Sequence, residues 1–152
     1  MYAKDTSVPV ERTKQEIEKL VMKYKADTFI CGWQGNVASI SFRMENRFVK
    51  FTLPLPVSIP DKYDPKNYRK IPGNGINEKQ LPQLIRSRWR ALLLVLKAKL
   101  ESVEAGISDF ETEFLGNVMV GNGQTVADLV KPGLEETYAR GGQLALPPGL
   151  GG

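Results

Sequence analysis

Three short runs of β-forming residues, separated by two pairs of turn residues, constrain the fold of this chain most strongly. Apolar and polar side chains alternate along these runs, most regularly in Val37–Met44, and a period of two is typical of a half-buried strand. Gly35-Asn36 and Glu45-Asn46 stand where tight turns are needed. The segment therefore predicts a three-stranded antiparallel meander over Thr28–Trp33, Val37–Met44 and Arg47–Leu53, with one apolar face.

Two amphipathic helices flank this predicted sheet. Thr13 and Glu16 have the spacing of a capping box and predict a first helix over 14–25. A long helix is expected from Pro82, which suits a first turn, to Ala105, with Gly106 as its cap. Its apolar stripe should pack on the sheet: Ile85, Trp89, Leu92, Leu93, Leu96, Leu100 and Val103.

The remaining third of the chain predicts a small acidic α/β part. The expected elements are a helix opened by Ser108 and Glu111 and running through Leu115, a strand over Asn117–Val120, and a helix capped by Thr125 and Asp128 that runs to about Arg140 and is bent or broken near Pro132. With 152 residues, one α+β domain over 1–140 is the natural reading. Residues 54–76, rich in Pro and Gly, should form an irregular loop, and 141–152 a flexible tail.

The residue types favour a protein without catalytic activity. Histidine is absent, which removes the commonest general base and transition-metal ligand. Cys31 is the only cysteine, lies in a predicted strand and is interpreted as a small buried hydrophobe. A group of acidic residues could hold Mg²⁺ for hydrolysis, since two of its members are neighbours on a helical face: Glu101 and Glu104, with Asp109, Glu111 and Glu113. The acidic residues near the capping box have a simpler explanation, because they favour a helix start. We therefore expect no catalytic residues, no metal and no cofactor.

Charge is distributed unevenly along the sequence. Residues 1–100 hold 19 Lys and Arg against 9 Asp and Glu, whereas residues 101–152 hold 2 against 8. This asymmetry indicates either two ordinary solvated faces or a basic face that meets phosphate. On the second interpretation, single-stranded DNA would bind through cations and one aromatic ring on a common surface. The candidate residues are Arg43, Arg47, Phe48, Lys50, Lys66, Arg69, Lys70, Arg86, Arg90 and Lys97.

Several segments carry a resemblance to known sequences. They are 2–12, 16–18, 51–54, 88–101, 103–107 and 123–126, of which the long-helix segment is the most specific. On these segments the chain resembles a group of small phage and prophage proteins that have no assigned catalytic residues. Lys25 departs from the group, where a glycine is expected to end the first helix. The resemblance implies a viral or mobile-element setting, and the predicted topology is also similar to that of phage single-strand annealing recombinases.

These observations lead to two hypotheses from different classes. The first is a phage nucleic-acid-binding protein that binds or anneals single-stranded DNA during recombination and forms a homo-oligomer. The alternative is an interaction protein that inhibits or adapts a host protein, such as a defence nuclease, through a charged face. No run of the sequence reaches the ~18 apolar residues of a membrane span, so we expect no membrane partner and a place in the host cytoplasm.

Overall fold

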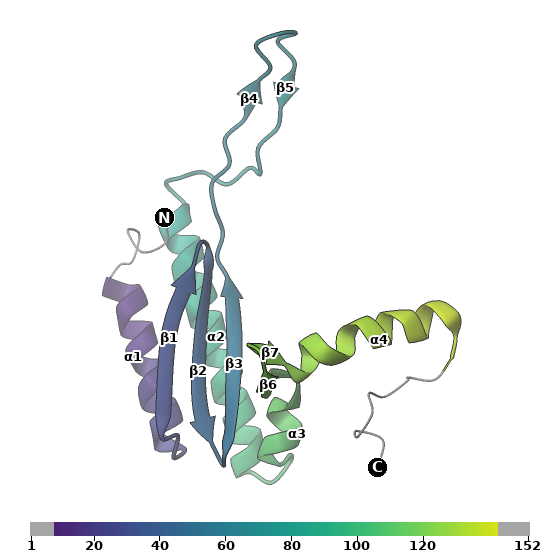
Figure 1. The fold of residues 1–152 in the computed structure, drawn as a ribbon. Helices are drawn as coiled ribbons and strands as arrows, with labels where there is room; N and C mark the ends of the chain where they lie inside the picture. Colours follow the sequence, from purple (N-terminus) through teal and green to yellow (C-terminus); the bar gives the residue numbers. More distant parts are fainter. Residues whose placement is uncertain (1–7, 143–152) are drawn as a thin grey trace.

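The computed structural model describes residues 8–142 as an α+β fold (Figure 1). The N-terminal part consists of helix α1 (Val8–Lys23), strands β1 (Thr28–Gln34), β2 (Val37–Met44) and β3 (Arg47–Pro54), a hairpin of β4 (Lys62–Tyr63) and β5 (Lys70–Ile71), and helix α2 (Leu81–Glu104). The C-terminal part consists of α3 (Phe110–Phe114), the 3₁₀ turn η2 (Leu115–Asn117), β6 (Met119–Gly121), β7 (Gln124–Thr125) and α4 (Val126–Arg140).

The three long strands form one antiparallel sheet in the order β1-β2-β3, as predicted. Two-residue turns join them, since Gln34 pairs with Val37 and Met44 with Arg47. Glu45 and Asn46 both have positive φ, 50° and 64°, which is the turn geometry that matches the twist of a hairpin. The predicted strand boundaries are therefore confirmed to within one residue.

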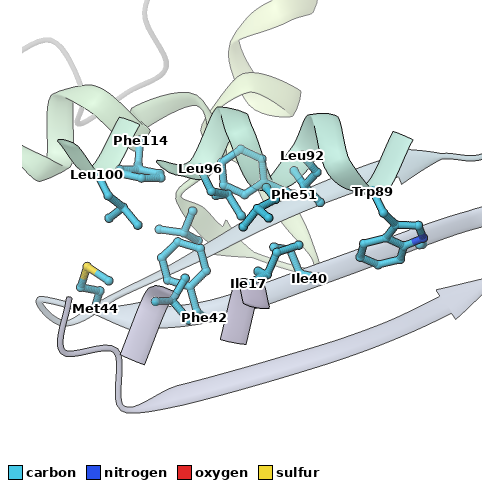
Figure 2. Packing of buried hydrophobic residues seen from close by; sticks show 14 of the residues in the cluster. Ile17, Ile40, Phe42, Met44, Phe51, Trp89, Leu92, Leu96, Leu100 and Phe114 are labelled. Carbon is cyan, nitrogen blue, oxygen red and sulfur yellow. The ribbon is translucent and has the colours of Figure 1, made fainter. Parts of the chain in front are cut away.

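Helices α1 and α2 lie together on one face of this sheet (Figure 1). The apolar side chains of β2 and β3 alternate toward them, and Ile40, Phe42 and Phe51 point at the α2 stripe (Figure 2). Trp89 and Leu96 on that stripe are fully buried. The predicted packing of the long helix across the apolar face is confirmed, and it supplies the main hydrophobic contribution to stability.

The C-terminal part is joined to the core by an aromatic cluster and by the edge of β3. The Phe114 ring meets Phe42 and Phe51 edge-on, with centroids 6.0 and 6.1 Å apart, a favoured aromatic geometry. The side-chain amide of Asn117 donates to the Lys50 carbonyl at 3.1 Å, and Val118 forms a bridge with Val49. These contacts fix η2 and β6 beside β3.

Helix α1 begins six residues earlier than predicted. The capping box is wrong, because Thr13 lies inside the helix and its hydroxyl donates to the Pro9 carbonyl at 3.0 Å. Pro9 instead sits in the first turn, where its missing N–H costs nothing, so Val8 is helical rather than extended. The helix ends at Lys23, and Lys25 has φ 72°, the left-handed conformation that favours the expected glycine.

The C-terminal elements need three further corrections. Helix α3 is capped by Asp109 rather than Ser108: the Asp109 carboxylate accepts from the Thr112 N–H at 3.1 Å. The box of Thr125 and Asp128 is confirmed, but α4 continues through Pro132 to Arg140 without a break. The strand expected over 117–120 is β6, two residues later. The predicted tail lies almost wholly outside the described residues.

Most of residues 54–76 have no regular secondary structure, but the connection is not irregular throughout. They carry the β4–β5 hairpin, which projects from the end of the sheet well away from the helices (Figure 1). We call residues 58–76 the arm, and the rest of the described chain the body. The composition of this segment did not predict an ordered arm, because proline and glycine residues suggest irregular backbone. The order of the arm depends instead on side-chain hydrogen bonds.

Candidate nucleic-acid interface

The ten residues predicted from the sequence do not form one surface. Four of them lie in strands β2 and β3: Arg43, Arg47, Phe48 and Lys50. Three lie in the arm, namely Lys66, Arg69 and Lys70, and three on the exposed side of α2, namely Arg86, Arg90 and Lys97. Because α2 covers the inner face of the sheet, its exposed flank and the outer face of the sheet are on opposite sides of the core. The expectation of a common surface is therefore wrong, and each group has to be assessed separately.

On the outer face of the sheet, Arg43 and Phe48 are directly opposite one another on β2 and β3. The guanidinium carbon lies 5.9 Å from the centre of the Phe48 ring, within cation–π range. Arg43 also donates to both carboxylate oxygens of Asp27 at 2.8 and 2.7 Å. These bonds hold the pKa of Asp27 below its ordinary value. The Arg43 charge is thus already balanced within the protein.

Beside Phe48 the surface is hollowed by about 700 Å³. Its lining includes Ile30 and Ser41 of the sheet, and Met119 and Asn122 of the β6–β7 hairpin. The sequence does not predict this part of the hollow, because no local pattern places the β6–β7 hairpin against β3. Arg47 lines the same hollow, although its Nε lies 3.8 Å from Glu111. Lys50, on the same strand, has no ion pair among residues 8–142.

Two of the three candidate residues on α2, Arg86 and Arg90, are engaged with neighbouring side chains. Arg90 forms an ion pair with Glu16 of α1 at 3.2 Å, and Arg86 donates to Gln83 at 2.6 Å. These two arginines border a hollow of about 440 Å³ between α1 and α2. The Arg90–Glu16 pair joins the two helices, whereas the Arg86–Gln83 bond lies within α2. The simpler interpretation as a solvated helix flank therefore fits these residues better.

The arm is fastened at its base by one asparagine. The Asn74 Oδ1 atom accepts from the Ile59 and Ile76 N–H groups, both at 3.1 Å, and Nδ2 donates to the Val57 carbonyl at 2.7 Å. Gly73 lies against the opposite chain so closely that an added Cβ would be 1.8 Å from the Ile59 oxygen. The base is therefore a defined structure.

Asp61 adds a second fastening point next to this base. Its carboxylate accepts from the Gly73 N–H at 2.7 Å and pairs with Lys70 at 3.2 Å. Both contacts favour the charged carboxylate, which lowers the pKa of Asp61. Lys70, one of the predicted binding residues, is thus engaged in holding the arm together.

The tip of the arm is a hydrogen-bonded turn. The Tyr68 N–H donates to the Asp64 carbonyl at 2.8 Å, and the Asp64 N–H donates to the Arg69 carbonyl at 2.9 Å. The Asp64 carboxylate also accepts from the Lys66 N–H at 2.8 Å. Tyr68 adopts φ 56°, an uncommon conformation for a bulky residue, and its side chain is 82% exposed. Lys66 and Arg69 make no ion pair within the described chain.

The other side chains singled out in the sequence, Cys31 and the acidic pair Glu101 and Glu104, lie apart from these basic groups. Cys31 is exposed rather than buried, because β1 is an edge strand. Partial desolvation raises the pKa of its thiol, which disfavours the reactive thiolate. Glu104 accepts a hydrogen bond from Tyr24 at 2.7 Å, and residues 8–142 contain no cluster of three metal-ligating side chains.

Comparison of the chain with protein-family models, with curated proteins and with solved structures finds no match in any of the three. The likeness to phage proteins and to annealing recombinases therefore stays a prediction. None of the helices between residues 8 and 142 is both long and apolar enough to cross a membrane.

Proposed function

We propose that the protein binds single-stranded nucleic acid, DNA in the first instance, and that the tip of the arm is its main contact. The observation that supports this proposal most strongly is an exposed aromatic ring that lies beside two cations without ion pairs in the described chain. Tyr68 is fixed by the tip turn at positive φ and stands in solvent, beside Lys66 and Arg69. Maintaining such a conformation at an exposed aromatic residue suggests a binding role.

The chemistry of this tip suits an unpaired strand. A base that is not stacked in a duplex can lie on the Tyr68 ring, a contact that does not depend on base identity. Lys66 and Arg69 would contact the flanking phosphates and release their counterions. Neither cation forms an ion pair with a carboxylate of the described chain. Binding to phosphate therefore does not require the free energy of breaking such a pair.

Phe48 and Lys50 repeat the combination of ring and cation on the outer face of the sheet. The adjacent hollow has room for a base beside the Phe48 ring. Arg43 and Arg47 contribute less, since each already faces a carboxylate. We assign this surface a secondary role in the same binding function.

Fluorescence anisotropy with labelled oligonucleotides, single- and double-stranded and at low and moderate salt, tests the proposal. Tyr68→Ala should weaken single-strand binding by about 1–3 kcal/mol and leave the salt dependence unchanged. Replacing Lys66 and Arg69 by Gln should flatten the plot of log affinity against log salt by about 0.7 per charge removed.

The chain offers matched controls for both changes. Tyr138 on α4 is 84% exposed, so Tyr138→Ala removes an equally accessible ring from another place. Lys97→Gln removes an exposed cation from the helical side of the core. Both controls should bind like the native protein. Equal losses in the controls and in the tip variants would show non-specific attraction and contradict a built site.

A protein partner is the second candidate, since Ile59, Tyr63 and Ile71 are also exposed on the arm. An arm that binds protein would use these apolar side chains more than its cations. Absence of binding to any oligonucleotide at about 50 mM salt, where phosphate attraction is strong, would overturn the nucleic-acid proposal and favour this candidate.

A further inference from the structure

Two hairpin turns that are far apart in the sequence lie beside Phe48 on the outer face of the sheet. Asn46 is in the turn between β2 and β3, and Asn122 is in the turn between β6 and β7. The bridge between Val118 and Val49 holds the start of the second hairpin at the β3 edge. Both asparagines consequently line the hollow of about 700 Å³ that borders the Phe48 ring.

The side-chain amides of these two asparagines are available to a ligand. Asn46 has φ 64° and Asn122 has φ 52°, so each backbone adopts the left-handed conformation that a tight hairpin turn requires. Asparagine side chains in turns often bond to their own backbone, but neither of these two donates or accepts a hydrogen bond within residues 8–142. Each amide can therefore offer a donor and an acceptor side by side.

The rest of the hollow is lined mainly by uncharged groups. The side chains of Ile30 and Met119 are apolar, and Ser41 adds a hydroxyl. Among the described residues that line the hollow, Arg47 alone is ionisable, and its Nε lies 3.8 Å from a carboxylate oxygen of Glu111. An apolar hollow with a few converging polar groups suits a small planar ligand with hydrogen-bonding edges. A nucleobase has this chemistry.

We propose that this hollow takes one unpaired base of a bound single strand and prefers adenine. The inference rests on the proposed binding function and adds a base preference, which the Tyr68 tip lacks because stacking on an exposed ring does not depend on base identity. In the hollow the base stacks on Phe48, while one asparagine amide donates to N7 and accepts from the N6 amino group. The other amide contacts the Watson–Crick edge, which is free in an unpaired base.

The pattern of donors and acceptors separates adenine from the other bases. A purine presents two hydrogen-bonding edges to the two amides, whereas a pyrimidine lacks the edge that carries N7. On that edge guanine has two acceptors, N7 and O6, so an amide satisfies only one of them. Arginine is the side chain that binds both acceptors of guanine, and here Arg47 faces Glu111. Adenine alone matches the donor and the acceptor of one amide.

Two labelled single strands of equal length test this preference on the native protein, one made of adenine and one of 7-deazaadenine. The analogue keeps the purine ring and the amino group but has carbon in place of N7, so the phosphate contacts are the same. Fluorescence anisotropy should show about fivefold tighter binding of the adenine strand, because the analogue loses one bond of a bidentate base contact. Tyr68→Ala should weaken the binding of both strands equally and leave their ratio unchanged.

Glycine substitutions locate the contact without straining either turn, because glycine adopts positive φ readily. The double variant Asn46→Gly with Asn122→Gly should bind the two strands with equal affinity. Asn36→Gly is the matched control, since it removes an exposed amide from the turn at the other end of β2. This control should keep the native preference for adenine.

The outcomes separate this inference from the proposed function. If the native protein binds adenine, thymine and 7-deazaadenine strands with equal affinity, the base preference is overturned and the binding function stands. If it binds none of them at about 50 mM salt, where phosphate attraction is strong, both are overturned. A preference for adenine that survives the double glycine variant would lie outside the hollow and contradict the proposed site.

Discussion

The body and the arm of this protein are stabilised by different kinds of interaction. In the body, side chains such as Trp89, Phe42 and Leu96 are removed from water between the sheet and α2 (Figure 2). In the arm, order depends on Asn74 and Asp61, whose hydrogen bonds link two chain segments that bury little apolar surface. Apolar burial contributes far more free energy than exposed polar contacts.

The difference implies that the arm can open while the body stays folded. A segment with few buried contacts and exposed hydrogen bonds unfolds locally at a low free energy. Stability and the proposed binding function therefore reside in separate parts of the chain. Substitutions in the body should therefore change the melting temperature, whereas substitutions at the base of the arm should change only the order of the arm.

The largest effect should come from the centre of the body. Trp89→Ala removes a fully buried ring from the interface of α2 with the sheet, and we expect a loss of about 3–5 kcal/mol in the free energy of unfolding. Urea denaturation followed by circular dichroism measures it. Leu94→Ala, at a 60% exposed position of the same helix, should change stability by less than about 0.5 kcal/mol. An unchanged Trp89→Ala midpoint would reject the packing.

A smaller and strictly local effect is expected at Gly73. Any Cβ there collides with the Ile59 carbonyl, so Gly73→Ala should open the base of the arm at a cost of about 1–3 kcal/mol. Trypsin should then cleave faster after Lys62 and Lys66, while the melting temperature of the body stays the same. Gly142→Ala, where a Cβ meets open space, is the control. A cleavage rate equal to that of the native protein would refute the close approach.

Asn74→Ala should loosen the same base somewhat less. It removes three hydrogen bonds that the side chain makes to the backbone, and at this exposed site we expect about 1–2 kcal/mol of local stability to be lost. Amide hydrogen exchange of residues 58–76 reports the opening. Asn74→Asp keeps both accepted bonds and loses only the bond to Val57, so its exchange should fall between the native and Ala rates.

The smallest effect is a titration in the acid range. The bonds from Gly73 and Lys70 hold the pKa of Asp61 below its ordinary value, so its contribution to the arm is present above about pH 4 and is lost as the pH falls below that. The Gly73 amide resonance should titrate with a midpoint below about 3.9. Asp61→Asn should abolish that titration. A midpoint at or above the ordinary value would show that Asp61 does not fasten the arm.

The body could largely be predicted from the sequence because local signals and packing agree there. The period of two in Val37–Met44, the two-residue turns and the α2 stripe each indicate the element that the structure has. The start of helix α1 was predicted wrongly. Thr13 and Glu16 have the spacing of a capping box, but the helix already begins at Val8, with Pro9 in its first turn. A capping pattern says where a helix can begin, and cannot exclude an earlier start.

The candidate site could be predicted only in part, for reasons of geometry. Residue types on the arm were recognised, but its order was not, because Asn74 and Gly73 act through partners fifteen or so residues away. Arg43 and Arg90 were grouped by charge alone. Which side of the core each one occupies depends on how α2 docks on the sheet, which no spacing along the chain reveals.

The central claim, that the arm binds and the body provides the stability, has one direct test. Residues 58–76 are replaced by a short Gly-Ser turn, and melting temperature and affinity for a single-stranded oligonucleotide are measured on the same preparation. The account predicts an unchanged melting temperature together with a loss of most of the affinity and salt dependence. A shortened protein that melts as before and still binds single strands with native affinity would contradict it.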